Sequence, residues 1–170
     1  APGWALAALL DDAAYVELIA SCNHVHPALW PLITRLKPAE RLLLVSDAIT
    51  LAGLGDGRAR VGSLDVEVVG QRVTLAGTST LAGSVIALDD AVRNLVGSGV
   101  PLPAAVAAAR RNPLALTGGP DRGRLAPGQG AAPGRLAAGP AGRPGTRGGV
   151  GRAGGGAVRA RRGRAPGGGG

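Results

Sequence analysis

Residues 41–52 read RLLLVSDAITLA, and the fold expected for this chain is built around them. Four consecutive apolar residues lead directly into Ser46 and Asp47, and a glycine-rich segment follows. An unbroken apolar run of this length is typical of a strand buried on both faces, as in a parallel sheet. The run predicts a strand over residues 41–46 with Asp47 at its C-terminal end, where parallel α/β folds, and barrels above all, place catalytic groups. The alternative is an aspartate that only caps a turn.

Charge and glycine content divide the chain into two parts. Residues 1–117 contain 9 Lys and Arg against 10 Asp and Glu, whereas residues 118–170 contain 10 Arg against one Asp. The second part therefore has a net charge of +9 and the first part −1, which together give +8, and the second part also holds 20 of the 30 glycines and no aromatic residue. Such a composition cannot bury enough apolar surface to offset the entropy of ordering. We expect one ordered domain over residues 1–117, followed by a disordered basic tail.

Absent features restrict the class of protein. The sequence contains no Met and opens on APGWALAALLDD, which predicts that it is a fragment of a longer protein. No apolar run approaches the roughly 20 residues that a transmembrane helix needs. The single cysteine, Cys22, leaves no internal disulfide and fits a reducing compartment. We therefore expect a cytoplasmic protein without a membrane partner.

The first half of the ordered part alternates between helical and strand patterns. Residues 11–20 begin with two acidic residues and continue with apolar periodicity, which predicts a short amphipathic helix. Residues 21–27, SCNHVHP, are typical of the tip of a strand, and Pro27 can open a helix over residues 27–37, which Pro31 limits or bends. An order of helix, strand, helix, strand indicates a parallel sheet or barrel.

The second half begins with turns. Residues 51–62 are turn-rich, and residues 61–77 alternate apolar and polar positions in two runs, which predicts a half-exposed β-hairpin. Residues 78–84, TSTLAGS, are small and polar and predict a loop. Helices are expected over residues 88–96 and 102–111, the second ending before Pro113.

Two short motifs suggest binding chemistry. In a strand, the spacing of His24 and His26 would point both rings to one face, beside Cys22, so that these three residues form a conceivable metal site. Two histidines are one ligand short of the three that a catalytic zinc site normally has, and contact of His24 with substrate is the stronger interpretation. The backbone N–H groups of the TSTLAGS loop could hold a polar ligand, although an ordinary loop would look the same.

Several segments together resemble the C-terminal portion of an N-acetylglucosamine-6-phosphate deacetylase, a family of the amidohydrolase superfamily. The resemblance runs from about residue 2 to residue 131, and each of its segments is a weak signal alone. In chain order they are LIASCNHVHP at 18–27, LLLVSDAITLAGLGDG at 42–57, TLAGS at 80–84 with DDAVRNLV at 89–96, and DRGRLAPGQGA at 121–131.

The resemblance implies a fold, a reaction and roles for five residues. The fold is a partial (β/α)8 barrel with only the C-terminal strands and helices, and the reaction is hydrolysis of N-acetylglucosamine 6-phosphate to glucosamine 6-phosphate and acetate. Asp47 matches the catalytic aspartate, which takes a proton from metal-bound water and returns it to the departing amine. His24 matches a histidine that contacts the substrate, and Leu81, Ala82 and Gly83 match the segment that holds the sugar phosphate.

The resemblance also implies what this chain does not contain. The intact family enzyme is expected to use a divalent metal, Zn or Fe, whose ligands, a Glu and two His, lie on earlier strands that are missing here. The family pattern before the histidine is Asp-Gly-x-His, whereas Ser21, Cys22 and Asn23 precede His24. A barrel of this type takes about 250 residues. We expect the chain to be inactive alone and the intact enzyme to be a homo-oligomer that acts on a small amino-sugar phosphate.

Two other functions remain as alternatives. The first is a non-enzymatic module whose Arg- and Gly-rich tail binds nucleic acid through phosphate charge. Because the tail lacks the aromatic residues on which single-stranded bases stack, we do not expect nucleic acid to be the partner. The second is a different metal-dependent amidohydrolase, against which the TLAGS segment argues.

Overall fold

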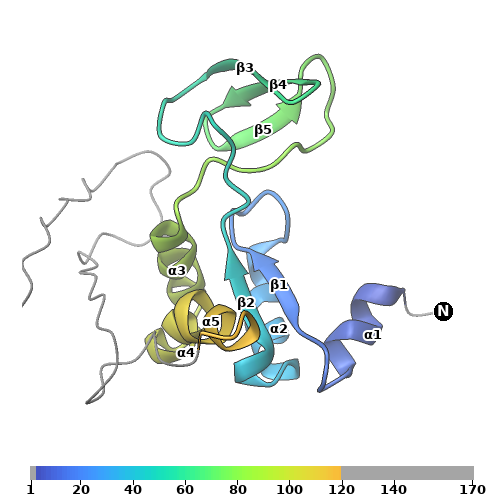
Figure 1. Cartoon of the computed structure of the whole chain (residues 1–170), viewed down its shortest axis with the longest axis vertical. Coiled ribbons are helices and arrows are strands. Elements are labelled where there is room, and N and C mark those ends of the chain that lie inside the picture. The colour runs from blue at the N-terminus through green and yellow to red at the C-terminus, as the bar shows by residue number, and fades with distance from the viewer. Residues whose placement is uncertain (1–2, 120–170) are drawn as a thin grey trace, which may run out of the picture.

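The computed structural model describes residues 3–119. The tail expected to be disordered lies outside the described residues, except for its first two glycines, and so does the DRGRLAPGQGA segment. Figure 1 shows two parts within the described residues: a larger part in which helices surround two strands, and a small three-stranded sheet at one end of it. The chain passes twice between these parts, just after β2 and just before α3.

The larger part is built on a parallel pair of strands. β1 (Val16–Ile19) pairs with β2 (Leu42–Val45), which confirms the strand expected from the apolar run. A 3-10 turn, η1 (Pro27–Leu29), and helix α2 (Trp30–Leu36) make the crossover that a parallel pair requires. Pro31 lies in the first turn of α2, where a missing N–H costs nothing, so it starts the helix and does not bend it.

The prediction of a helix over residues 11–20 is wrong. The structure places strand β1 there, and the preceding helix, α1 (Trp4–Leu10), ends where the acidic residues begin. Asp11 has extended backbone angles and caps the C-terminus of α1. The alternation of a buried Leu18 with more exposed neighbours fits a strand that packs one face against the core. Pairing with β2 therefore outweighs the local helical pattern.

Four helical segments cover the parallel strands. The expected helix over residues 88–96 is confirmed as α3 (Leu88–Gly97), and α4 (Leu102–Val106), the π-helical η3 (Ala107–Arg111) and α5 (Asn112–Leu116) follow. Their apolar faces close a core with the strands and α2. The buried members of this core are Leu18, Ala20, Trp30, Leu42, Leu44, Ile86, Ala91, Val92, Leu95, Val100, Ala105 and Ala108.

The sequence predicted that the last helix ends before Pro113, but in the structure the helical path continues through Pro113. The π turn of η3 shifts the hydrogen-bond register, and Pro113 then occupies the first turn of α5, where it needs no N–H donor. Asn112 fixes this junction from within the core. Its buried side-chain amide donates to the carbonyl oxygens of Ala39, in the short 3-10 turn η2 (Ala39–Arg41), and Leu42 over 2.6 and 2.8 Å.

The small sheet is antiparallel and has its own core. The expected hairpin is confirmed as β4 (Leu64–Val69) and β5 (Arg72–Leu75), joined through Gly70 and Gln71. A third strand, β3 (Gly57–Val61), pairs with β4 and was missed because its sequence reads as turns. Val66, Val68 and Val73 form the buried centre of this sheet.

The described residues form an open α/β unit. Two parallel strands are present between residues 3 and 119, so this part of the chain does not show the closed eight-stranded barrel. Over the same residues, no helix is both long and apolar enough to cross a membrane.

Candidate active site

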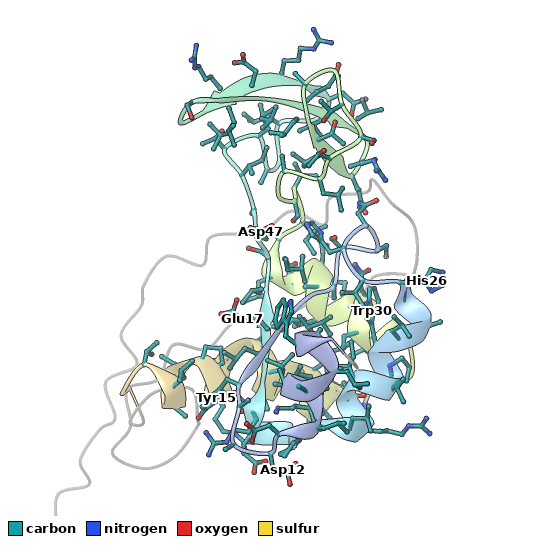
Figure 2. All side chains as sticks on the ribbon, turned by 90° about the vertical axis from the view of Figure 1, so that its right-hand side faces the viewer. Asp12, Tyr15, Glu17, His26, Trp30 and Asp47 are labelled. Atoms are coloured by element: carbon teal, nitrogen blue, oxygen red, sulfur yellow. The ribbon has the colours of Figure 1, made fainter. Side chains whose placement is uncertain are left out.

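Asp47 lies just beyond the C-terminal end of β2, as the sequence predicts. Its φ angle is 51°, a left-handed conformation that aspartate tolerates better than most residues. The carbonyl oxygen of Asp47 accepts a hydrogen bond from the N–H of Ser84 over 2.8 Å, and the N–H of Ile49 donates to the carbonyl oxygen of Ser84 over 2.9 Å. These bonds fix the backbone while leaving the carboxylate half-exposed, between the two parts of the molecule (Figure 2).

His24 lies next to Asp47. Because β1 and β2 are parallel, the loops that follow them meet at one edge of the pair. The loop after β1 brings the Nε2 atom of His24 to 3.6 Å from the Oδ2 atom of Asp47. The other ring nitrogen, Nδ1, lies 2.8 Å from the hydroxyl oxygen of Ser21. The His24 side chain is largely buried, with 18% of its surface exposed.

His26 does not join this site, which corrects the expectation that it shares a face with His24. Residues 21–25 form bends and not a strand, and Cys22 turns the chain with a φ angle of 65°. The ring of His26 caps η1 instead, since its Nδ1 atom accepts a hydrogen bond from the N–H of Ala28 over 3.3 Å. Figure 2 shows His26 away from Asp47, near the start of α2.

The Leu81–Gly83 segment connects the small sheet to Asp47. Leu81 bridges to Thr74 of β5, and the N–H of Ala82 donates to the carbonyl oxygen of Val73 over 3.1 Å. Two residues later Ser84 bridges to Ala48, which lies beyond the end of β2, so Gly83 lies directly against Asp47. The loop expected at residues 78–84 is therefore confirmed, and both of its ends are anchored.

Gly83 is required by this close approach. Its φ angle is 102°, and a Cβ atom at this position would lie 2.7 Å from the Cγ2 atom of Ile49 and 3.2 Å from the carbonyl oxygen of Asp47. Contacts under 3.0 Å force something to move. Asp47, His24 and Gly83 thus come together in space, and the N–H of Ala82 is already used within the protein.

Sequence reasoning missed the buried hydroxyl groups that support the site. Ser84 donates from its Oγ atom to the carbonyl oxygen of Ser46 over 2.6 Å and accepts from the N–H of Ile86 over 3.2 Å. Ser21 is fully buried against His24. The only signal was a small polar residue after the apolar stretch that ends at Ala20 and another at the end of the TSTLAGS loop, and such residues are too common to single out.

The residues present do not fit a metal centre. Among residues 3–119 no group of three or more His, Cys, Asp and Glu side chains is placed to hold a metal ion. The alternative site of Cys22, His24 and His26 fails because His26 faces elsewhere. Burial also raises the pKa of the Cys22 thiol, which disfavours the thiolate that binds metals.

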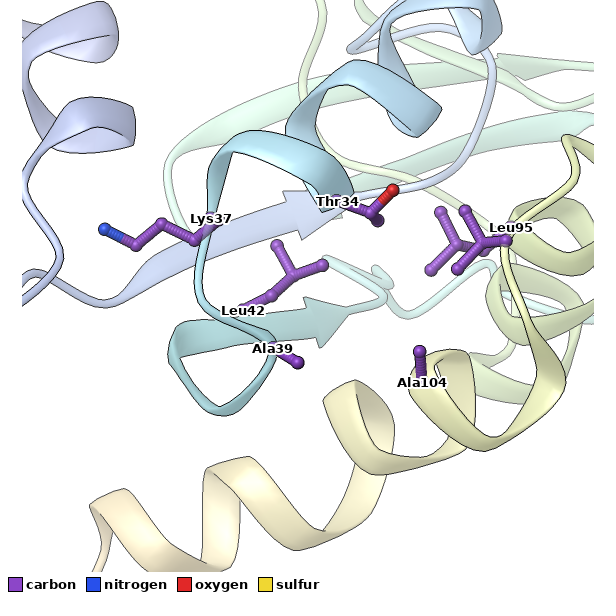
Figure 3. A pocket seen from close by; sticks show the side chains of 7 residues that line it. Thr34, Lys37, Ala39, Leu42, Leu95 and Ala104 are labelled. Carbon is purple, nitrogen blue, oxygen red and sulfur yellow. The ribbon is translucent and has the colours of Figure 1, made fainter.

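A cavity in the larger part is not connected with Asp47. It measures about 20 Å³, enough for roughly one water molecule, and it lies at the beginning of β2, near Leu42, Leu95 and Ala104 (Figure 3). Lys37 contributes only its stem, because its ammonium group donates to the carbonyl oxygens of Ala8 and Asp11. The cavity is a gap in the core packing and offers no binding chemistry.

Comparison of the sequence with characterised proteins identifies relatives. No protein-family model matches the chain. It is 38% identical over 133 residues to an Escherichia coli K12 protein named "Putative N-acetylgalactosamine-6-phosphate deacetylase", a match that covers 77% of this chain and 78% of that protein. Identity to the human N-acetylglucosamine-6-phosphate deacetylase is 40% over 105 residues, covering 61% of this chain and 25% of that protein.

Solved structures agree with the sequence comparison. The N-acetylglucosamine-6-phosphate deacetylase of Thermotoga maritima superposes with a TM-score of 0.68 at 34% identity, covering 72% of this chain and 34% of that one. An Asp-to-Ala variant of the Mycobacterium smegmatis enzyme was solved with N-acetyl-D-glucosamine-6-phosphate, and it superposes with a TM-score of 0.66 at 38% identity. The match covers 69% of this chain and 32% of that one. The chain thus spans about a third of these solved relatives. It belongs to the N-acetylhexosamine-6-phosphate deacetylase family.

Proposed function

We propose that this chain supplies the proton-transfer group and part of the substrate site of an N-acetylglucosamine-6-phosphate deacetylase. The observation that carries the proposal is the 3.6 Å approach of His24 Nε2 to Asp47 Oδ2 at the ends of two parallel strands. Because the chain spans about a third of its solved relatives, the activity is proposed for the full-length protein.

In the proposed reaction Asp47 moves one proton. The oxygen of water bonds to the carbonyl carbon of the acetamido group, and the bond from that carbon to nitrogen breaks. The carboxylate of Asp47 takes a proton from the attacking water and gives it to the leaving nitrogen, so that acetic acid and the free amine form. The acid then gives its proton to the amine or to water and becomes acetate. Transfer of a proton by a positioned side chain typically contributes 10²–10⁴-fold to a rate. The left-handed backbone at Asp47 fixes the carboxylate for this role.

The neighbours of Asp47 provide the remaining contacts. We assign His24 to a polar group of the substrate beside the acetamido group, because its Nε2 atom faces the carboxylate that must reach the same bond. We assign the sugar phosphate to the Leu81–Gly83 segment because these residues match the phosphate-holding segment of the family that the chain resembles, and because Gly83 lies against Asp47. The short distance between Gly83 and Asp47 then brings the phosphate segment and the reacting bond into one site.

A hybrid enzyme tests the proposal. Residues 3–119 of this chain replace the matching segment of the Mycobacterium smegmatis deacetylase, and acetate release from N-acetylglucosamine 6-phosphate is measured. Hydrolysis is expected, because the Mycobacterium smegmatis enzyme supplies the two thirds of its own length that this chain does not match. A hybrid that matches the parent in circular dichroism and gel filtration but releases no acetate would overturn the proposal. The matched control carries His26→Asn, outside the site, and should keep the activity of the hybrid.

The same hybrid distinguishes the two sugars for which relatives are named. The two Escherichia coli relatives are named for N-acetylgalactosamine 6-phosphate, whereas the human and Thermotoga maritima relatives are named for N-acetylglucosamine 6-phosphate. We expect the higher kcat/KM with the glucosamine derivative, since the solved relatives at 34–38% identity are named for it. The reverse order would assign the chain to the galactosamine branch.

A further inference from the structure

Ser21 makes a contact to His24 that the proposed reaction does not use. The Ser21 side chain is fully buried, and its Oγ atom lies 2.8 Å from the Nδ1 atom of His24. The same Oγ atom accepts a hydrogen bond from the N–H of Asn23 over 3.4 Å. His24 therefore has a hydroxyl group at one ring nitrogen and the carboxylate of Asp47 at the other.

The acceptor capacities of these groups favour one direction of hydrogen bonding. A carboxylate only accepts, so at the nitrogen that faces Asp47 a hydrogen is favoured over a lone pair. In the neutral ring the other nitrogen, Nδ1, is then an acceptor and needs a donor. A hydroxyl group carries one hydrogen, which the Oγ atom of Ser21 can donate to Nδ1 while it accepts from the N–H of Asn23. The opposite tautomer would point a lone pair of Nε2 at the carboxylate.

We infer that Ser21 is a positioning residue that fixes the tautomer of His24, with the hydrogen on Nε2 and directed at Asp47. The hydrogen bonds then run in one sense, from the N–H of Asn23 through the hydroxyl group to the ring and on to the carboxylate. The Nε2 to Oδ2 distance of 3.6 Å is long for a hydrogen bond, and such distances in active sites shorten when substrate binds. Any effect of this tautomer on acetate release rests on the proposed function of Asp47. The inference about the tautomer itself does not depend on that function.

The imidazole nitrogens of the full chain report the tautomer directly. The protein contains only two histidines, so a long-range ¹⁵N–¹H correlation spectrum of the labelled chain holds two ring systems. In its neutral form His24 should show a protonated Nε2 and a bare Nδ1. His26 serves as an internal reference, because its Nδ1 atom accepts from Ala28 and does not contact Ser21.

Three substitutions of Ser21 separate positioning from a merely structural role. Ser21→Thr keeps the hydroxyl group and should leave the His24 spectrum unchanged. Ser21→Ala removes the donor, so the shifts of the two nitrogens should move toward each other as the tautomers mix. Ser21→Asp places an acceptor at Nδ1 as well, so both nitrogens should become protonated and the bare-nitrogen signal should be lost. In every variant the His26 signals should stay in place.

Two results would overturn the inference. The first is a wild-type His24 with its hydrogen on Nδ1, or with averaged shifts like those of free imidazole. The second is a set of Ala and Asp variants whose His24 spectra match the wild type. Because the readout needs no turnover, it is independent of acetate release by the hybrid enzyme, and either proposal can fail without the other.

Discussion

The carbonyl oxygen of Asp47 accepts a hydrogen bond from the N–H of Ser84 over 2.8 Å, which ties the end of β2 to the loop that returns from the small sheet. The side chain of Ser84 strengthens this tie, because its buried Oγ atom bridges the carbonyl oxygen of Ser46 and the N–H of Ile86. Ser84 thus holds the candidate catalytic carboxylate in place from a segment 37 residues further along the chain.

Replacement of Ser84 by alanine should lower the free energy of unfolding by about 1–3 kcal/mol, because it leaves two buried backbone groups without their partner. Urea unfolding followed by circular dichroism measures this loss. Ser79→Ala is the matched control, since Ser79 is exposed on the same loop and should change stability little. Equal stabilities of the two variants would contradict the bridging role of Ser84.

Replacement of Gly83 by alanine should be more damaging than the same change at another left-handed glycine. At Gly83 a Cβ atom meets Ile49 and the Asp47 backbone, whereas at Gly77, with a φ angle of 75°, it meets nothing within 4 Å. Gly77→Ala should therefore cost about 1 kcal/mol for the backbone conformation alone. Gly83→Ala should cost about 1–3 kcal/mol more through the clash and should reduce acetate release by the hybrid. The difference in unfolding free energy between the variants measures the clash, and no difference would contradict it.

Replacement of Cys22 by glycine should stabilise the protein. Cys22 has a φ angle of 65°, and a left-handed conformation costs about 1–2 kcal/mol for a residue other than glycine. Part of this gain is lost to the greater freedom of glycine in the unfolded chain, so an increase of about 0.5–1 kcal/mol in the free energy of unfolding is expected. Cys22→Ala removes the thiol but keeps the backbone conformation, and it should show no such gain. If alanine stabilised as much as glycine, backbone strain would not be the cause.

The thiol of Cys22 should react slowly with an alkylating reagent at neutral pH. Cys22 is exposed, but partial burial of its thiol raises the pKa, so a smaller fraction is present as the reactive thiolate than in an unfolded chain. The rate of carboxamidomethylation, measured with and without urea at the same pH, should be lower in the folded protein. As the pH rises above the ordinary pKa of a thiol, the difference in alkylation rate between the folded and the unfolded protein should become smaller. A faster reaction in the folded protein would contradict the raised pKa.

The sequence could predict the elements whose pattern is decided locally. The apolar run of β2 needs burial on both faces whatever its neighbours are, and the hairpin of β4 and β5 shows both alternation and a turn at Gly70. β1 could not be predicted in the same way, because two acidic residues before it resemble the start of a helix and only pairing with β2 makes it a strand. The π turn at η3 likewise depends on packing.

For the site, the position of Asp47 at the end of a strand could be predicted from the apolar run before it. Its 3.6 Å approach to His24 depends on the parallel pairing of β1 with β2, which the local sequence pattern did not show. The expectation for His26 failed because β1 ends at Ile19, so the spacing of the two histidines no longer places them on one face. The contribution of Ser21 and Ser84 could not be predicted, since hydroxyl groups reveal their partners only once the chain is folded.

The most direct measurement of the central claim is the kcat of the hybrid enzyme with Asp47→Asn. Asparagine also tolerates a left-handed backbone, so the fold should be kept while the proton acceptor is removed. The account predicts a kcat at least ~100-fold lower, the usual contribution of a positioned acid–base group, with Asp12→Asn on the exposed surface as an unaffected control. An Asp47→Asn hybrid that releases acetate at the rate of the unchanged hybrid would contradict the claim that Asp47 moves the proton.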